Sequence, residues 1–199
     1  MPEAIFVRHG HTESTIEGIK GRSDVSLSEE GMKEMLMTGL LLSTQPPLPD
    51  RIVASPLIRA RQSAQIINSV YKNSLPMEVS EDVNELDVGD WTGKAKALAF
   101  QEYEENWQAM HAESFESAQK RIVRELERLA QTGSQKNIVL SHSILMTLLY
   151  AMLPKAEGLP EMIPMMNGCG FVVSLEPVFQ VTALFPDGIL EEMKEMDLV

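Results

Sequence analysis

Residues 5–10 read IFVRHG, an apolar run of β-branched and aromatic side chains that stops at a cation, a histidine and a glycine. Such a short run favours a buried strand that passes directly into a loop. The pattern recurs at residues 52–54 (IVA), which Ser55-Pro56 follows, and at residues 138–140 (IVL), which Ser141-His142 follows. We therefore predict three buried strands that each end in polar residues.

Segments with helical periodicity separate these strands. Ser28 is a suitable N-cap for a helix to about Leu42, and Ser55-Pro56 opens a second helix that runs to about Tyr71. Residues 114–130 and 144–152 are predicted to form two further helices. Apolar side chains follow helical spacing, the pattern of a core-facing side, in the first helix (Met32, Met35, Leu36 and Leu40) and in the third (Ala118, Ile122, Leu126 and Leu129).

The remaining strand signals lie at residues 77–79 and in a hairpin of residues 171–175 and 178–184 around Glu176-Pro177. Strands that alternate with helices and consist of continuous apolar runs are typical of a parallel sheet covered on both faces. The predicted fold class is therefore α/β, a doubly wound, mainly parallel sheet with helices on both faces. The apolar hairpin near Phe171 is expected either in the core or at an interface.

The chain has 199 residues and no internal repeat, so we expect a single domain over residues 1–199. Residues 92–112 are interpreted as a small helical insertion that covers the pocket. The acidic tail at residues 188–199 is expected to be a surface helix or a mobile segment.

Composition narrows the possible partners. The net charge is −12, which disfavours nucleic acid and anionic lipid as partners and requires cations to cluster wherever an anionic substrate binds. The single cysteine, Cys169, rules out an internal disulfide framework and is expected to be an inert thiol. We see no secretory signal and no apolar stretch of membrane-spanning length, and expect a cytoplasmic protein.

In parallel sheets, ligands bind beyond the carboxyl ends of the strands. The three buried strands end at Arg8-His9, at the segment from Ser55 to Arg59, and at His142, so these residues are expected at one edge of the sheet. Arginine grips phosphate with two parallel charge-assisted bonds, and a neutral imidazole can act as a nucleophile. This combination of residues indicates phosphoryl transfer.

Five segments carry a resemblance that extends over nearly the whole chain. They are RHGHTE at residues 8–13, GRSDVSLSEEG at 21–31, SPLIRARQSA at 55–64, ELDVGDWTG at 85–93 and LSHS at 140–143. In this order they resemble the histidine phosphatase superfamily, the phosphoglycerate mutase-like group.

The resemblance implies a set of roles. His9 would take the phosphoryl group, while Arg8, Arg59 and His142 would bind its oxygens. Glu85 would protonate the leaving group and then activate water. Further substrate contacts would come from Thr15, Gly21 and Ser143. The family implies no metal and no organic cofactor, and the substrate would be a small phosphorylated metabolite.

Some residues differ from the family pattern, and others can be interpreted as structural and not functional. His11, Thr15 and Ser143 replace residues that are common in the family, which puts the substrate in doubt more than the activity. Glu85 lies among acidic neighbours, which we expect to raise its pKa. Other residues are interpreted as structural or are left open: Arg61 as a surface residue, Trp91 and Trp107 as packing anchors, and His11 and His111 as undecided between substrate contact and loop or surface positions.

The segment 85–91, with Trp107 and Glu113-Ser114, is similar to the α-ribazole phosphatase and broad-specificity phosphatase branch. Mutases of the group are usually longer, so a hydrolase is favoured over a mutase. The sequence also admits a phosphoprotein phosphatase and, least favoured, a non-enzymatic phospholigand-binding module. It leaves the natural substrate and the oligomeric state open.

Overall fold

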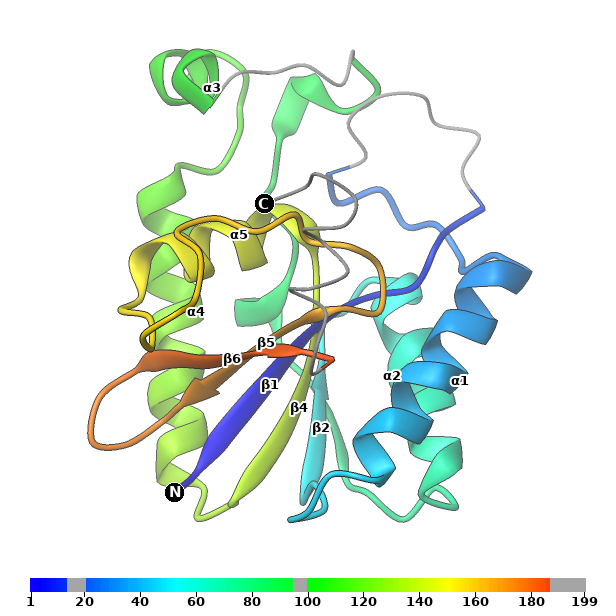
Figure 1. Ribbon diagram of the computed structural model, residues 1–199. Coiled ribbons are helices and arrows are strands. Elements are labelled where there is room, and N and C mark those ends of the chain that lie inside the picture. Colours follow the sequence, from blue (N-terminus) through cyan, green and yellow to red (C-terminus); the bar gives the residue numbers. More distant parts are fainter. Residues whose placement is uncertain (14–20, 95–99, 187–199) are drawn as a thin grey trace.

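A sheet of strand order β3-β2-β4-β1-β5-β6 runs through the residues that the computed structural model describes, 1–13, 21–94 and 100–186 (Figure 1). Strands β3, β2, β4 and β1 run parallel to one another, whereas β5 pairs antiparallel with both β1 and β6. The expected mainly parallel sheet is confirmed. The strand bounds are β1 Glu3–Arg8, β2 Arg51–Ala54, β3 Met77–Val79, β4 Lys136–Ser141, β5 Gly170–Ser174 and β6 Gln180–Phe185.

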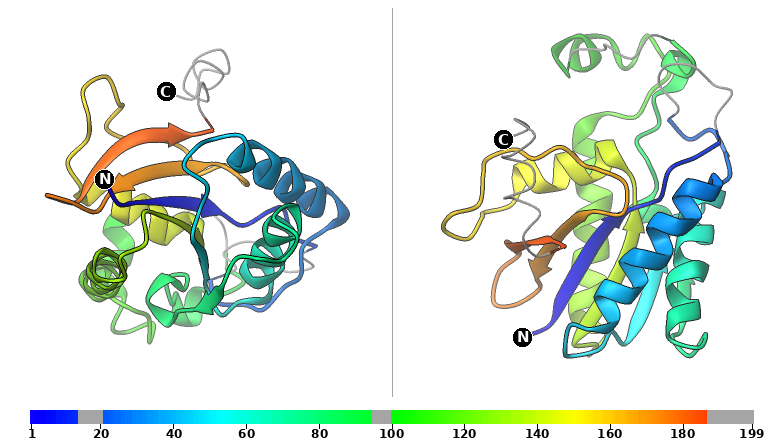
Figure 2. Two further views of the ribbon diagram at one scale, coloured as in Figure 1. Left: turned by 90° about the horizontal axis from the view of Figure 1, so that it is seen from below. Right: turned by 45° about the vertical axis from the view of Figure 1, so that its right-hand side comes forward.

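Helices cover both faces of the sheet, as the alternation of strands and helices predicts. Helices α1 (Glu29–Ser43) and α2 (Ile58–Val70) lie on one face, and α4 (Phe115–Gln131) and α5 (Ser143–Met152) lie on the other (Figure 2). A shorter helix, α3 (Phe100–Asn106), lies beyond the ends of the strands in Figure 1. None of the helices in the described ranges is long and apolar enough to cross a membrane.

Two apolar cores follow from the alternation of side chains along the strands. Ala4 and Phe6 of β1 pack with the α4 and α5 layer, while Ile5 and Val7 pack with the α1 and α2 layer. All four side chains are buried, because a strand that is covered on both faces has no solvent side. This is why the buried strands read as continuous apolar runs.

Helix α1 begins after Ser28, whose hydroxyl accepts a hydrogen bond from the amide of Gly31, so the expected N-cap is confirmed. The expected core-facing side is wrong. Met35 is fully buried, but Met32, Leu36 and Leu40 are exposed by 45%, 44% and 44%. The helix instead turns its small residues inward, including Gly31, Thr38 and Gly39.

Close backbone approach explains this choice of face. A Cβ atom at Gly39 would lie 3.0 Å from the Val70 side chain and 3.2 Å from the Cα atom of Ile67, both in α2. The two helices therefore pack closely at a residue without a side chain. Hydrophobic spacing identifies the largest side chains on a helix, but here the small residues set the contact.

The C-terminal hairpin is confirmed, with β5 and β6 paired on either side of residues 175–179. Phe171 is fully buried, and its ring stacks on that of Phe6 with 5.7 Å between centroids, so the hairpin belongs to the core. The tail expected at residues 188–199 lies outside the described residues, as does Thr15.

Candidate active site

The ends of three parallel strands meet at one edge of the sheet. Strand β4 lies between β2 and β1, and Leu140 of β4 is level with Ala54 on one side and with Val7 on the other. The residues that follow these strands are therefore neighbours. The Nε2 atom of His142 lies 2.7 Å from the Ser55 hydroxyl, and the rings of His9 and His142 are 5.1 Å apart between centroids.

The two ring nitrogens of His9 have different partners, which assigns its tautomer. Nδ1 lies 2.7 Å from the carbonyl oxygen of Gly10, an acceptor, so Nδ1 carries the proton. Nε2 receives a hydrogen bond from Nε of Arg59 at 3.1 Å, so Nε2 carries the lone pair. The loop that follows His9 is held tightly, because a Cβ atom at Gly10 would lie 2.5 Å from the carbonyl oxygen of Gly31. The ring is thus fixed with a nucleophilic nitrogen toward Arg59.

Arg59, the second residue of α2, is buried and directed by two backbone carbonyls. Its Nη1 donates to Ser23 at 2.6 Å and its Nη2 donates to Gly21 at 2.9 Å. Burial lowers the pKa of Arg59, and the charges of Glu85 and Asp24 act in the opposite direction. Gly21 adopts a positive φ of 48°, which a side chain rarely tolerates, so it presents its carbonyl where few other residues could.

Arg8 is held by a loop that the sequence did not single out. Its guanidinium Nη1 donates to the carbonyl oxygen of Met165, while its backbone amide donates to Cys169 and its carbonyl accepts from Gly168. Thr38 of α1 in turn donates to the carbonyl oxygen of Gly168 at 3.2 Å. Residues 162–169 have no periodicity and no charged side chain, so the sequence offered no signal that they position a cation.

Two buried nitrogen atoms beside His9 point to a ligand. Within the described part of the chain, neither Nδ1 of His142 nor Nε of Arg8 has a hydrogen-bond partner. Buried polar atoms are nearly always paired, so these two nitrogen atoms are available to an acceptor that binds at this site. Burial lowers the pKa of His142 well below its usual value, and the His9 ring, whenever it is protonated, and the charges of Arg59 and Arg8 act in the same direction, which keeps the His142 ring neutral.

The carboxyl group of Glu85 is buried at the start of α5. Its Oε1 accepts from the amides of Leu86 at 2.9 Å and Leu145 at 3.2 Å, and its Oε2 accepts from Ile144 at 3.4 Å. Burial nevertheless raises the pKa of Glu85 above its usual range, against these hydrogen bonds and the charge of Arg59. The raised pKa was expected, but its expected cause, the neighbouring carboxylates, is wrong: desolvation is the main cause.

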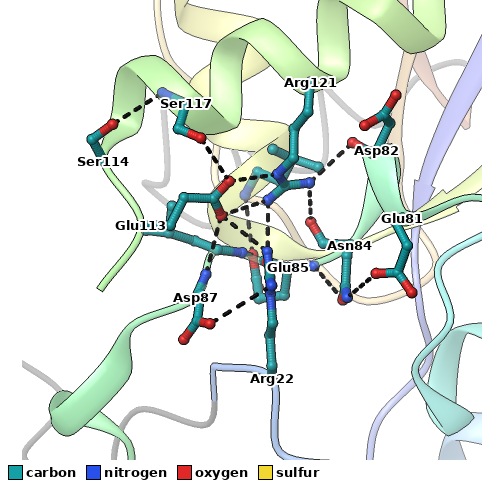
Figure 3. Close-up of polar contacts among 12 residues, drawn as sticks. Arg22, Glu81, Asp82, Asn84, Glu85, Asp87, Glu113, Ser114, Ser117 and Arg121 are labelled. Atoms are coloured by element: carbon teal, nitrogen blue, oxygen red, sulfur yellow. Dashed lines mark hydrogen bonds and ion pairs between the residues drawn. The ribbon is translucent and has the colours of Figure 1, made fainter. Parts of the chain in front are cut away.

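The backbone of Glu85 is clamped by a network that the sequence did not reveal (Figure 3). Its carbonyl oxygen accepts from Nε of Arg22 at 2.9 Å and from Nη2 of Arg121 at 3.2 Å. Arg121 also donates to the carbonyl oxygens of Asp82 and Asn84, at 3.0 and 2.6 Å. A signal was present, because Arg121 lies within the apolar stripe of α4, where a charged side chain needs a buried partner.

The other residues considered from the sequence lie as follows. Ser143 is the first residue of α5, so its amide lies at the helix N-terminus beside His142. His11 is exposed and contacts the Ser28 hydroxyl through Nδ1 at 2.8 Å, and His111 is exposed and paired with Asp90 at 3.0 Å. Trp91 is buried against Tyr103 of α3, with 4.8 Å between ring centroids, and Trp107 packs against the core, as expected of packing residues. Arg61 is exposed, as expected of a surface residue.

In the ranges 1–13, 21–94 and 100–186, no group of three His, Cys, Asp or Glu side chains is arranged to hold a metal ion. The donors of the site are nitrogen atoms of arginine and histidine and backbone amides. Together they surround the Nε2 lone pair of His9 with positive charge and place one buried carboxyl group nearby. This arrangement can bind a tetrahedral oxyanion in front of a nucleophile and supply a proton to it.

Comparison with known proteins agrees with this chemistry. Residues 4–177 match the model of the histidine phosphatase superfamily (branch 1). The chain is 30% identical over 160 residues to the adenosylcobalamin/alpha-ribazole phosphatase of Escherichia coli (strain K12), a match that covers 74% of this chain and 77% of that protein. It is 33% identical over 118 residues to phosphoglycerate mutase 1 of Saccharomyces cerevisiae, covering 58% of this chain and 48% of that protein.

The fold is also similar to that of a known structure. The crystal structure of phosphoglycerate mutase from Bacillus anthracis str. Sterne superimposes with a TM-score of 0.77 at 20% sequence identity, covering 92% of each chain. At this identity the likeness concerns the fold alone. It extends to the sheet and helices that bring His9 and His142 to one edge.

Proposed function

Because the chain belongs to the histidine phosphatase superfamily, we propose that it hydrolyses a small phosphomonoester in two steps through a phosphohistidine on His9. Arg8, Arg59 and His142 bind the phosphoryl oxygens, and Glu85 is the acid and base. The amide of Ser143, together with Gly21 and Thr15, completes the substrate contacts. A cytoplasmic location and metal-independent chemistry are part of this proposal.

The observation that carries the proposal is the arrangement of donors around one lone pair. Arg59 donates to Nε2 of His9 at 3.1 Å, and the unpartnered nitrogens of Arg8 and His142 are buried beside it. A phosphoryl group in front of Nε2 would accept hydrogen bonds from all three side chains. For Nδ1 of His142 to donate, its Nε2 must accept the single proton of the Ser55 hydroxyl, which lies 2.7 Å away, in place of the Asn84 Oδ1 atom at 3.3 Å.

In the first step, Nε2 of His9 attacks phosphorus and the bond from phosphorus to the leaving oxygen breaks. The proton of the Glu85 carboxyl group passes to that oxygen, so the product leaves as a neutral alcohol. The hydrogen bond from Nδ1 of His9 to the carbonyl oxygen of Gly10, 2.7 Å long, stabilises the positive charge that develops on the ring.

In the second step, water attacks the phosphohistidine. The Glu85 carboxylate takes a proton from the water, the bond between phosphorus and nitrogen breaks, and inorganic phosphate leaves. His9 returns to its neutral form and Glu85 regains its proton. The sum is one ester and one water converted into one alcohol and one phosphate.

The substrate is proposed to be a small phosphorylated metabolite. The curated relative from Escherichia coli acts on α-ribazole phosphate by its name, which makes that ester the first candidate, beside a broad set of others. Residues 92–112 are proposed to cover the pocket. Their helix α3 is anchored at the site by Tyr103, whose hydroxyl lies 3.0 Å from the carbonyl oxygen of Asp87 and 2.7 Å from that of Glu113.

A second candidate is phosphoryl transfer between phosphoglycerates, which the likeness to mutases favours. The matched region is 48% of the Saccharomyces cerevisiae mutase, so that likeness covers only part of the mutase. A mutase must shield its phosphohistidine from water. Transfer of labelled phosphate between phosphoglycerates, faster than its release to water, would support this second candidate.

Hydrolysis of p-nitrophenyl phosphate in the presence of EDTA, by the parent and by His9→Ala, tests the proposal. Removal of the nucleophile is expected to lower kcat by at least about 10³-fold. Brief mixing with labelled substrate and an alkaline quench should trap acid-labile label on the parent and not on the variant.

The control is His111→Asn, which removes an imidazole from an exposed position instead of the buried imidazole of His9. His111 has a positive φ of 54°, a conformation that asparagine tolerates, so the variant should keep the fold and the activity. A parent that releases no phosphate from any ester, or a His9→Ala variant that retains full activity, would overturn the proposal.

A further inference from the structure

Glu113 lies between two arginines that both touch the backbone of the proposed acid (Figure 3). Its Oε1 accepts from Nε of Arg121 at 2.8 Å, and its Oε2 accepts from Nη2 of Arg121 at 3.0 Å and from Nη2 of Arg22 at 3.1 Å. The side chains of Glu113 and Arg121 are 11% and 8% exposed, so this forked pair is little screened by water.

The two arginines reach the same atom from different elements. Arg22 comes from the segment whose carbonyls direct Arg59, and Arg121 comes from α4, yet both donate to the carbonyl oxygen of Glu85. Both guanidinium groups bind the backbone of Glu85, and positive charge near a carboxyl group favours its ionised form, although Arg59 is the strongest cation acting on that group. An acid that must hold a proton at neutral pH needs these charges balanced, and Glu113 is the carboxylate that contacts both.

Glu113 is itself fixed in place by backbone contacts. Its amide donates to the carbonyl oxygen of Asp87 at 2.7 Å, its carbonyl oxygen accepts from the Tyr103 hydroxyl, and its Oε2 accepts from the amide of Asp87 at 3.3 Å. The backbone of Glu113 is thus tied to the 82–91 loop and to Tyr103, while the amide of Asp87 and the two arginines hold its carboxylate. This rigidity is expected of a residue that sets a neighbour's charge.

We propose that Glu113 is a positioning residue, which balances the charges of Arg22 and Arg121 and so keeps the Glu85 carboxyl group protonated and correctly placed. This inference rests on the proposed role of Glu85 and deepens it. Glu113 acts through the two arginines, which hold the loop that carries the acid.

Other ionisable groups surround Glu85 and must stay unchanged in the test. On its own loop Asp82 is paired with Arg124 at 2.6 Å, and Asp87 lies 3.6 Å from Arg22. Arg8 of β1, Arg59 of α2 and Tyr103 of α3 interact electrostatically with Glu85. Ionisable groups also lie on the adjoining segments, namely His9, His142 and Glu81.

The test is a carbon-detected NMR titration of the Glu85 carboxyl in protein labelled with ¹³C-glutamate, assigned by the signal that Glu85→Gln removes. In Glu113→Gln, the amide oxygen can still accept from Arg121, but the negative charge is lost. The titration midpoint of Glu85 should therefore fall by about 0.5–1 unit. In Arg22→Gln, one positive charge is lost, and the midpoint should rise.

Shifts of opposite sign distinguish charge balance from loss of structure, since loosening the loop would expose Glu85 and lower its midpoint in both variants. Glu116→Gln is the matched control, because it removes one charge from an exposed pair with Lys120 on the same helix α4 and should leave the midpoint unchanged. If Glu113→Gln does not fold by circular dichroism, the sign of the shift in Arg22→Gln decides.

The titration does not depend on turnover, so it separates this inference from the proposed function. Midpoints that do not move, or that move in the same direction in both variants, overturn the role of Glu113 even if the parent hydrolyses esters. Opposite shifts support the charge balance even if the parent is inactive. Where the parent is active, the alkaline limb of its pH–rate profile should follow the NMR midpoint.

Discussion

The two histidines of the site are both neutral, but for different reasons. His9 has its proton fixed on Nδ1 by the carbonyl oxygen of Gly10, whereas His142 is kept neutral by burial and by the cations around it. The lowered pKa of His142 means that the unfolded chain binds this proton more tightly than the folded chain. This group therefore costs stability as pH falls below its unfolded value of about 6.5.

Glu85→Gln should reveal the acid through its dependence on the leaving group. An alkyl phosphate needs a proton on its leaving oxygen, so kcat/KM, which reports the first step and not the hydrolysis of the phosphohistidine, should fall about 10²–10⁴-fold. p-Nitrophenol leaves readily as an anion, so p-nitrophenyl phosphate should lose much less. Steady-state kinetics on both esters measure the difference, and an equal loss on both would argue against the acid role.

The same substitution should stabilise the fold at alkaline pH. Burial raises the pKa of Glu85, so the folded state holds this proton more tightly than the unfolded state does. The stability that protonation contributes is complete below the unfolded pKa and is lost as pH rises through the folded pKa. Thermal denaturation should therefore show a higher Tm for Glu85→Gln above neutral pH and little difference in mild acid.

At the scale of elements, the sequence predicts best where periodicity coincides with burial. The central residues of β1 and all residues of β4 are buried, and the apolar stripe of α4 contains the four side chains expected from its spacing. Helix α1 shows what hydrophobic periodicity does not predict. Its ends follow from Ser28 and the break after Ser43, but its packed face does not, since Gly39, which allows close approach to α2, carries no hydrophobic signal.

A pair of neighbouring residues in α1 tests its packed face. Met35→Ala should lower the free energy of unfolding by about 2–5 kcal/mol, because the side chain is fully buried against α2 and the sheet. Leu36→Gln should change it by no more than about 0.5 kcal/mol, because the side chain is 44% exposed. Urea denaturation measures both. Comparable losses would mean that Leu36 is covered in solution.

At the scale of the whole molecule, the site is assembled from segments that are distant in the chain. The convergence of Arg8, His9, Arg59 and His142 could be predicted, because the carboxyl ends of parallel strands share one edge. The supports of those residues could not. The loop that holds Arg8 has no pattern, and the network of Arg121 with Glu113 joins charges whose pairing depends on packing between α4 and the 82–91 loop.

The placement of the site predicts where a phosphate analogue should slow hydrogen exchange. Orthovanadate bound in front of His9 would accept hydrogen bonds from Arg8, Arg59 and His142, and would connect three strand ends and the N-terminus of α5. Peptides that cover residues 5–13, 57–63, 82–88 and 141–146 should therefore exchange more slowly, although they are far apart in sequence.

The molecule provides its own controls for this experiment. The β5–β6 hairpin and the C-terminal end of α4 border a groove lined by Gln131, Pro177 and Phe179, none of which is among the proposed site residues. Peptides from this groove should not change. Mass spectrometry of the parent and of Arg59→Ala, each with and without orthovanadate, measures the pattern. Protection at the groove, or protection that survives in Arg59→Ala, would place the oxyanion elsewhere and contradict the assembled site.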